Sequence, residues 1–170
     1  MGMFMASAAF SKPEEALWQN VKVRLIDFLS EQEGFTNNLE SQSSAFAIVS
    51  PYGDGGQILA AIAPQISQLI GGIVVFATCC DSDFDLIEVY QKGELVEKCY
   101  IGACFEGFME FGEYTKPNMD FWKSLLVDAS KEDQLHCALF EETVFAEDNL
   151  RKLSELTALP IFDDALVFME

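Results

Sequence analysis

The densest group of side chains that could do chemistry is an acidic run formed by Asp81, Asp83, Asp85 and Glu88. Carboxylates at this spacing could bind a divalent cation or pair with the Lys and Arg side chains of a basic partner. The start of the run resembles a calcium-binding loop, but Leu86 stands where that loop requires glycine. We therefore interpret the run chiefly as a solvated turn and strand edge, with a cation or basic-partner contact as the alternative.

Aromatic side chains are concentrated in residues 102–122, together with three glycines. Phe105, Phe108, Phe111 and Tyr114 lie in the first part of this segment. One interpretation is a binding loop for a ligand or partner, since aromatic side chains often dominate binding energy. The other interpretation is a loop that its own aromatic side chains anchor to the core. We favour the second, because aromatic residues usually pack inward.

The remaining nucleophiles and metal ligands form no recognised catalytic pattern. The five cysteines include no Cys-x-x-Cys pair, and the neighbours Cys79 and Cys80 would point to opposite faces of a strand. The single histidine, His136, precedes Cys137 on an expected helix, where adjacent side chains face different directions. The glycines that follow Gly53 lack the lysine of a phosphate-binding loop. We predict no catalytic residue, no metal ligand and no cofactor, so an enzyme is the less favoured class.

The charge balance excludes one class of partner and favours another. The 170-residue chain has 28 acidic residues against 10 Lys and Arg, which gives a formal net charge of −18. Proteins bind a nucleic-acid backbone through clustered Lys and Arg, so nucleic acid is excluded as a partner. A large acidic excess instead steers encounters with cationic proteins.

The same sequence predicts one domain in the cytoplasm. Half of the residues are apolar, which suits a single domain spanning residues 1–170, with residues 1–10 expected to be frayed. Residues 55–80 carry no charge and could cross a membrane by length, but Pro64 interrupts them and no Lys or Arg flanks them. We therefore predict no membrane contact. An odd number of cysteines, and no basic residue before Lys12 to begin a signal peptide, predict a cytoplasmic protein with reduced thiols.

Hydrophobic periodicity and turn signals predict the elements that position these residues. The first helix is expected to begin after a Ser11 cap and to stop at Gly34. The expected elements after it are a strand at 45–49, a helix at 57–70, strands at 73–80, 84–91 and 94–101, helices at 117–127, 130–140 and 146–159, and a strand at 165–168. The order α-β-α-β-β-β-α-α-α-β indicates an α+β fold, with a mostly antiparallel sheet and helices packed on one face.

Lys92 and Gly93 are expected to form the turn of a hairpin between two of these strands. The simplest register sets Glu88 opposite Glu97, which is an unfavourable pairing of like charges. A β-bulge that shifts the pairing by one residue is the alternative.

Two segments of the chain resemble a family of uncharacterised bacterial proteins. Residues 74–100 contain a strand, an Asp-Ser-Asp turn and a Gly-Glu-Leu-Val hairpin, and residues 144–160 begin an amphipathic helix with Phe-Ala-Glu-Asp. After Tyr100 the family tends to read Asn-Ser-x-Pro-x-Tyr-Phe, whereas residues 101–108 here do not. The resemblance implies the layout of these elements and a bacterial source, and it implies no known activity.

Together, these features lead us to expect an acidic, non-catalytic interaction protein that binds a basic protein partner, in the manner of small bacterial immunity proteins. A carboxylate-based or divalent-cation-dependent enzyme, with its chemistry near Asp81 and Asp83, is one alternative. A small-molecule-binding domain that uses the aromatic residues within 102–122 is the other.

Overall fold

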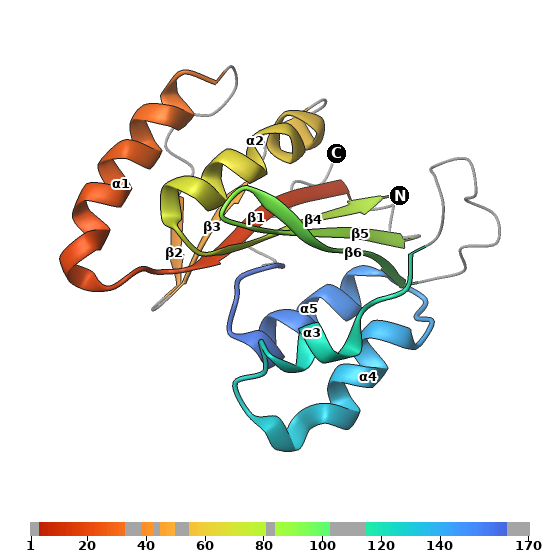
Figure 1. Ribbon diagram of the computed structural model, residues 1–170. Helices are drawn as coiled ribbons and strands as arrows, with labels where there is room; N and C mark the ends of the chain where they lie inside the picture. Colours follow the sequence, from red (N-terminus) through yellow and green to blue (C-terminus); the bar gives the residue numbers. More distant parts are fainter. Residues whose placement is uncertain are drawn as a thin grey trace.

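Runs of β-branched and apolar residues build an antiparallel sheet, as a computed structural model of the chain shows (Figure 1). The structure describes residues 4–32, 39–42, 45–49, 55–80, 84–102 and 115–162. Within these residues the strands are β1 (Phe4–Ser11), β2 (Leu39–Gln42), β3 (Ala45–Val49), β4 (Ile73–Cys80), β5 (Phe84–Gln91) and β6 (Glu94–Gly102). Their order across the sheet is β2-β3-β1-β4-β5-β6, and each neighbouring pair is antiparallel.

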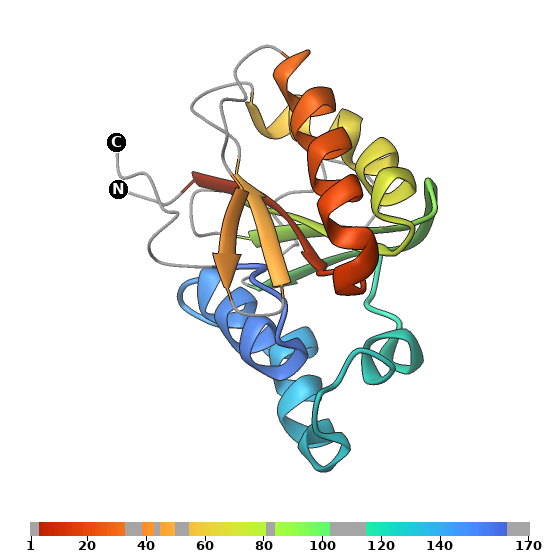
Figure 2. The same cartoon turned by 90° about the vertical axis from the view of Figure 1, so that its left-hand side faces the viewer.

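Helices lie on both faces of this sheet (Figures 1 and 2). The first two are α1 (Glu15–Ser30) and α2 (Gly55–Ile70), which cover one face. The opposite face is covered by α3 (Met119–Lys123), α4 (Glu132–Phe140) and α5 (Glu147–Thr157), with a 3-10 turn at Ala129–Lys131 before α4.

Each face of the sheet has its own apolar core, because alternate residues of a strand point to opposite sides. Under α1 and α2 the largest buried side chains are Phe10, Trp18, Leu25, Leu59, Ile66 and Phe76. Under α3, α4 and α5 they are Ile87, Ile101, Trp122, Leu135, Leu150 and Leu153. The strands β1 and β4 contribute side chains to both cores, so the centre of the sheet is buried on both sides.

The α+β class and the antiparallel sheet are confirmed, and the predicted elements that fall on described residues occur in the predicted order. The structure differs from the prediction in placing helices on both faces of the sheet. The physical reason is that both sides of β4 are apolar, since Val74 and Phe76 enter one core while Val75 and Ala77 enter the other. The strand expected at 165–168 lies outside the described residues.

Residues 4–10 were expected to be frayed, and that expectation is wrong. They belong to β1, which pairs with β3 on one side and with β4 on the other. Ala8 and Phe10 are fully enclosed there. Ser11 ends this strand and therefore does not cap α1, whose first residue follows Glu14 instead.

The β5–β6 hairpin adopts the bulged register. Lys92 and Gly93 form its turn with φ values of 52° and 91°, as a two-residue turn of type I′ requires. A shift in register follows a few residues from the turn, so Glu88 lies opposite Lys98 and not opposite Glu97. The bulge thus replaces a pair of like charges with a pair of opposite charges.

Among the residues that the structure describes, no helix combines the length and the apolar character needed to cross a membrane.

Candidate functional site

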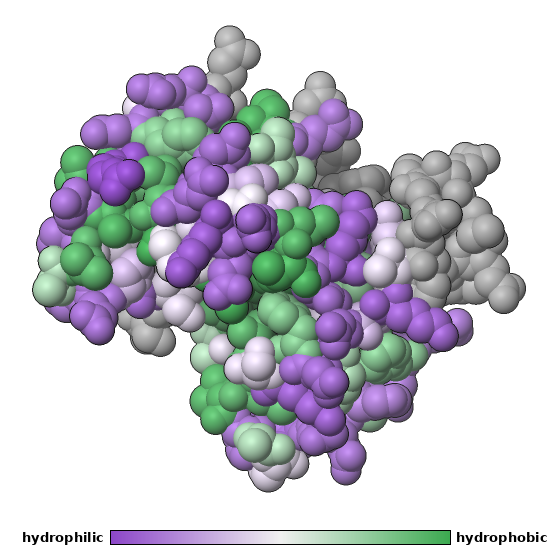
Figure 3. Space-filling model, in the orientation of Figure 1, coloured by the Kyte–Doolittle hydropathy of each residue, from purple (hydrophilic) through white to green (hydrophobic). Residues whose placement is uncertain are grey.

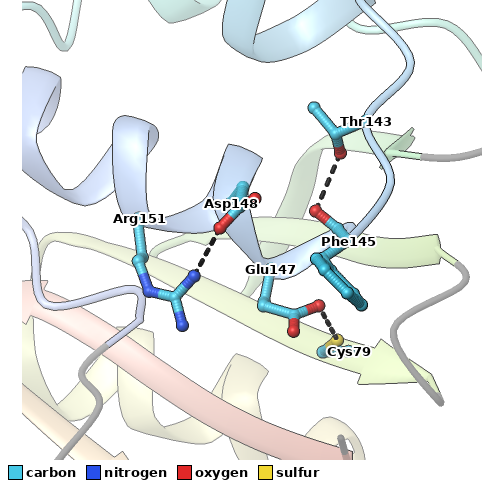
Figure 4. Close-up of polar contacts among 6 residues, drawn as sticks. All are labelled: Cys79, Thr143, Phe145, Glu147, Asp148 and Arg151. Carbon is cyan, nitrogen blue, oxygen red and sulfur yellow. Dashed lines mark hydrogen bonds and ion pairs between the residues drawn. The ribbon is translucent and has the colours of Figure 1, made fainter. Parts of the chain in front are cut away.

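Three buried polar side chains meet at one end of the sheet. Asp85 lies on β5 directly opposite Cys79 of β4, and Glu147 is the first residue of α5. Asp85 is 0% exposed, Cys79 is 1% exposed and Glu147 is 6% exposed. The Cys79 Sγ atom lies 4.0 Å from Oε2 of Glu147, which points toward the strand from the helix (Figure 4). We call these three residues the acid cluster.

The strand alternation and a single glycine explain how this cluster becomes enclosed. Asp85 shares its face of β5 with the buried residues Ile87 and Val89. The start of α5 then packs directly on the end of β6, where Gly102 has φ 103°. A Cβ at Gly102 would lie only 2.6 Å from the Cβ of Ala146. Because glycine allows this close approach, the helix start covers Asp85.

The environment of Asp85 favours its neutral form. Neither carboxylate oxygen makes a hydrogen bond of normal geometry. Burial raises the pKa of Asp85 well above its ordinary value, the neighbouring Cys79 thiol opposes this rise, and the negative charge of Glu147 adds to it. The folded protein therefore favours the protonated form of Asp85 more strongly than the unfolded chain does.

The residues described around the acid cluster supply no metal centre. Among the described residues, no group of three or more His, Cys, Asp and Glu side chains is arranged so that it could hold a metal ion. Cys79 and Cys99 are buried, and Cys137 is partly buried. Burial raises the pKa of the Cys99 thiol, and the charge of Glu97 adds to the rise, so this thiol stays protonated and unreactive.

Glu88 lies on the other face of β5 from Asp85, since the two residues are three positions apart on a strand. Its Oε1 atom accepts a 2.7 Å hydrogen bond from Lys98 Nζ, and its Oε2 atom accepts a 2.8 Å hydrogen bond from the Tyr90 hydroxyl. Burial raises the pKa of Tyr90, and the hydrogen bond to Glu88 raises it further. The structure therefore separates Glu88 from Asp85 and gives it a bracing role in the β5–β6 hairpin.

The other residues predicted to form a site lie outside the described residues. They are Asp81, Asp83, Phe105, Phe108, Phe111 and Tyr114. Cys80 is the last described residue before 81–83, and Gly102 is the last described residue before 103–114. Both residues pair with Phe84. The acid cluster thus lies at the end of the sheet from which both predicted segments depart.

Glu147 is the member of the acid cluster that sequence reasoning missed. A glutamate in the first turn of an amphipathic helix ordinarily faces solvent and stabilises the positive end of the helix dipole. The available signal was Asp85 itself, whose alternation with Ile87 and Val89 predicts an inward position. That signal shows a buried acid, but the sequence cannot show which helix covers it.

The exposed surface of the helical layer formed by α3, α4 and α5 is acidic. Its exposed acids are Asp120, Asp128, Glu132, Asp133, Glu141, Glu142 and Glu155. All 10 Lys and Arg residues lie in the described part of the chain, and four of them pair with acids. The four ion pairs are Lys12–Glu15, Lys98–Glu88, Lys123–Glu132 and Arg151–Asp148.

The fold and this surface define an acidic α+β protein with a buried acid cluster. Comparison of the chain with protein-family models, with curated proteins and with solved structures finds no match.

Proposed function

We propose that this protein is a non-catalytic, acidic interaction protein that binds a basic protein partner. The observation that carries the proposal is the acidic excess: 28 acids against 10 cations, four of which pair with acids among the described residues. A field of this sign raises the rate of encounter with a cationic protein and repels nucleic acid and anionic lipid.

The distribution of the acids supports this proposal. Acidic side chains are exposed along α3, α4 and α5, while apolar residues such as Trp122, Leu135 and Leu150 pack in the core under the sheet. Hydrophilic residues surround smaller apolar areas on the face of the molecule that Figure 3 shows. Polar rims around apolar contacts are the usual composition of protein interfaces.

The enzyme alternative, whose chemistry would lie near Asp81 and Asp83 outside the described residues, stays a prediction, and the enclosure of Asp85 does not favour it. A carboxyl group that acts on a substrate must come within hydrogen-bonding reach of it. The carboxyl of Asp85 is 0% exposed, so a substrate would reach it only after α5 moved. The small-molecule alternative depends on aromatic residues outside the described part of the chain, and it stays a prediction.

The test of the proposed function is affinity capture from an extract of the source organism at low and at high salt. The immobilised protein should retain a basic protein at low salt and release it at high salt. An unrelated acidic protein of similar charge density serves as the matched control bait, because it reports simple ion exchange. If no basic protein is enriched over the control bait, the proposed function is wrong.

A further inference from the structure

The linker between α4 and α5 exposes an unusual share of apolar side chains. Phe140 is 38% exposed, Val144 is 84% exposed and Phe145 is 53% exposed. Among the described residues, eight large apolar side chains are exposed, and three of them fall within these six consecutive positions. Single exposed apolar residues are normal, but a contiguous group is typical of an interaction site. We call residues 140–145 the corner segment.

Hydrogen bonds at both ends hold the corner segment in one conformation. At its start, Glu141 N donates to the Cys137 carbonyl at 3.0 Å, and the buried Asn149 side chain donates to the Glu141 carbonyl at 3.0 Å. At its end, the Thr143 hydroxyl donates to the Phe145 carbonyl at 2.8 Å (Figure 4). A binding surface that is already ordered loses less conformational entropy when a partner docks.

Acidic side chains lie between the apolar ones along the corner segment. Glu141 and Glu142 are both exposed between Phe140 and Val144. Glu141 also raises the pKa of the neighbouring Cys137 thiol, an effect that Lys152 of α5 opposes. The corner segment itself contains Glu141 and Glu142 and no Lys or Arg, so it is acidic.

We propose that the corner segment is the surface that docks the basic partner, a proposal that rests on the proposed function. Val144 and Phe145 fill an apolar pocket of the partner, while Glu141 and Glu142 pair with Lys or Arg side chains around that pocket. Buried aromatic anchors with a charged rim are the usual source of binding energy and specificity. A second copy of this chain is disfavoured as the occupant, because each copy carries a net charge of −18.

The test uses two synthetic cationic peptides of equal charge as probes. One contains lysine and leucine at helical spacing, and the other has glutamine in place of each leucine. Calorimetric titration should show tighter binding of the lysine–leucine peptide. The double variant Val144→Ser/Phe145→Ser should weaken that binding by about tenfold, the loss expected for removing hot-spot side chains, and should leave binding of the lysine–glutamine peptide unchanged.

Val127→Ser provides the matched control, because Val127 is 69% exposed on the same helical layer but lies outside the corner segment. It should change the affinity for the lysine–leucine peptide by less than about twofold, as expected for an exposed side chain outside the contact. If the double variant and Val127→Ser behave alike, or if neither peptide binds, the corner segment is not the docking surface. The proposed function is decided separately by the capture experiment, which does not depend on this segment.

The oligomeric state of the protein shows whether a second copy of the chain, and not a basic partner, covers the corner segment. Sedimentation should show a monomer at concentrations at which the peptide binds. If the wild-type protein instead dimerises and the double variant does not, then a second copy covers the corner segment and the inference of a basic partner is overturned.

Discussion

Asp85 occupies an environment that ordinarily excludes a carboxylate. Its side chain is fully enclosed, has no hydrogen bond of normal geometry and faces the charge of Glu147. An ionised group in such a place costs several kcal/mol, so the fold favours the protonated form of Asp85. In the unfolded chain the same carboxyl group ionises at its ordinary pKa. Because the folded-state pKa is the higher of the two, folding favours the uptake of a proton by Asp85 wherever the unfolded chain leaves this group ionised.

The first prediction concerns Asp85→Asn, which preserves the shape of the side chain and removes its titration. Because the pKa of Asp85 is raised in the folded state, its contribution to stability is fully present below the unfolded pKa. That contribution is lost as the pH rises toward the folded pKa. The variant should therefore match the wild type at acid pH and exceed it at neutral pH. We expect a gain of more than about 1 kcal/mol, since one unit of pKa corresponds to about 1.4 kcal/mol.

Urea unfolding as a function of pH measures this effect. Asp27→Asn is the matched control, because it makes the same chemical change at an exposed position. The control should change the free energy of unfolding by less than about 0.5 kcal/mol at every pH. Equal behaviour of the two variants would show that Asp85 is ionised in the folded protein.

The second prediction concerns the ion pair between Glu88 and Lys98. Lys98 is 39% exposed, so solvent screens the attraction even though the two charged atoms are 2.7 Å apart. A double-mutant cycle with Glu88→Gln and Lys98→Met should give a coupling energy below about 1 kcal/mol. Thermal unfolding of the wild type, the two single variants and the double variant supplies the measurement. A coupling energy several times larger would show that this ion pair stabilises the hairpin more than an exposed pair does.

At the scale of elements, the contact between the end of β6 and the start of α5 decides whether the acid cluster is enclosed. Gly102 makes this contact with φ 103° and leaves no room for a Cβ. Gly71 also has a positive φ, 72°, but a Cβ there would meet nothing within 4 Å. A substitution at Gly71 therefore strains only the backbone, whereas one at Gly102 strains the backbone and also brings the new Cβ against Ala146.

The third prediction compares Gly102→Ala with Gly71→Ala. Gly71→Ala should cost about 1–2 kcal/mol, because only the left-handed backbone conformation is strained. Gly102→Ala should cost at least about 2 kcal/mol more, because Ala146 must also shift and α5 with it. Chemical denaturation gives both values, and faster hydrogen exchange in α5 of Gly102→Ala would localise the damage. Equal losses in the two variants would show that α5 does not rest on Gly102.

The sequence was sufficient to predict the elements whose apolar pattern is local. Strand β4 and the paired strands β5 and β6 have continuous or alternating apolar residues, and α2 has a helical stripe. The sequence was insufficient for β1, because Met, Ala and Ser at a chain start carry no strand signal until β3 and β4 pair with them. The acid cluster was not predicted for the same reason. The interpretation as a solvated turn and strand edge is wrong for Asp85, although its alternation with Ile87 and Val89 indicates an inward position. Glu147 acts on Asp85 from 62 positions away in the chain, which no local pattern encodes.

At the scale of the whole molecule, a single sheet carries two cores and ties the ends of the described chain together. The hydroxyl of Ser7 on β1 donates a buried 2.6 Å hydrogen bond to the carbonyl of Ile161, which follows α5. The helical layer that presents the acidic surface is therefore fastened to the central strand. This arrangement holds the corner segment in a fixed position relative to the sheet, as a preorganised docking surface requires.

The net charge of −18 acts on this whole structure, and the fourth prediction follows from it. Like charges on one compact molecule repel each other, and salt shortens the range of that repulsion. The range is about 30 Å at 0.01 M ionic strength and about 10 Å at 0.1 M. Raising NaCl from about 0.01 M to about 0.2 M should therefore stabilise the protein by about 1 kcal/mol, or about 2–4 °C in Tm for a chain of this length. Tetramethylammonium chloride should give the same rise in calorimetry, since screening does not depend on the identity of the cation. A larger rise with magnesium or calcium at equal ionic strength would contradict pure screening and would instead indicate a specific cation site among the acids.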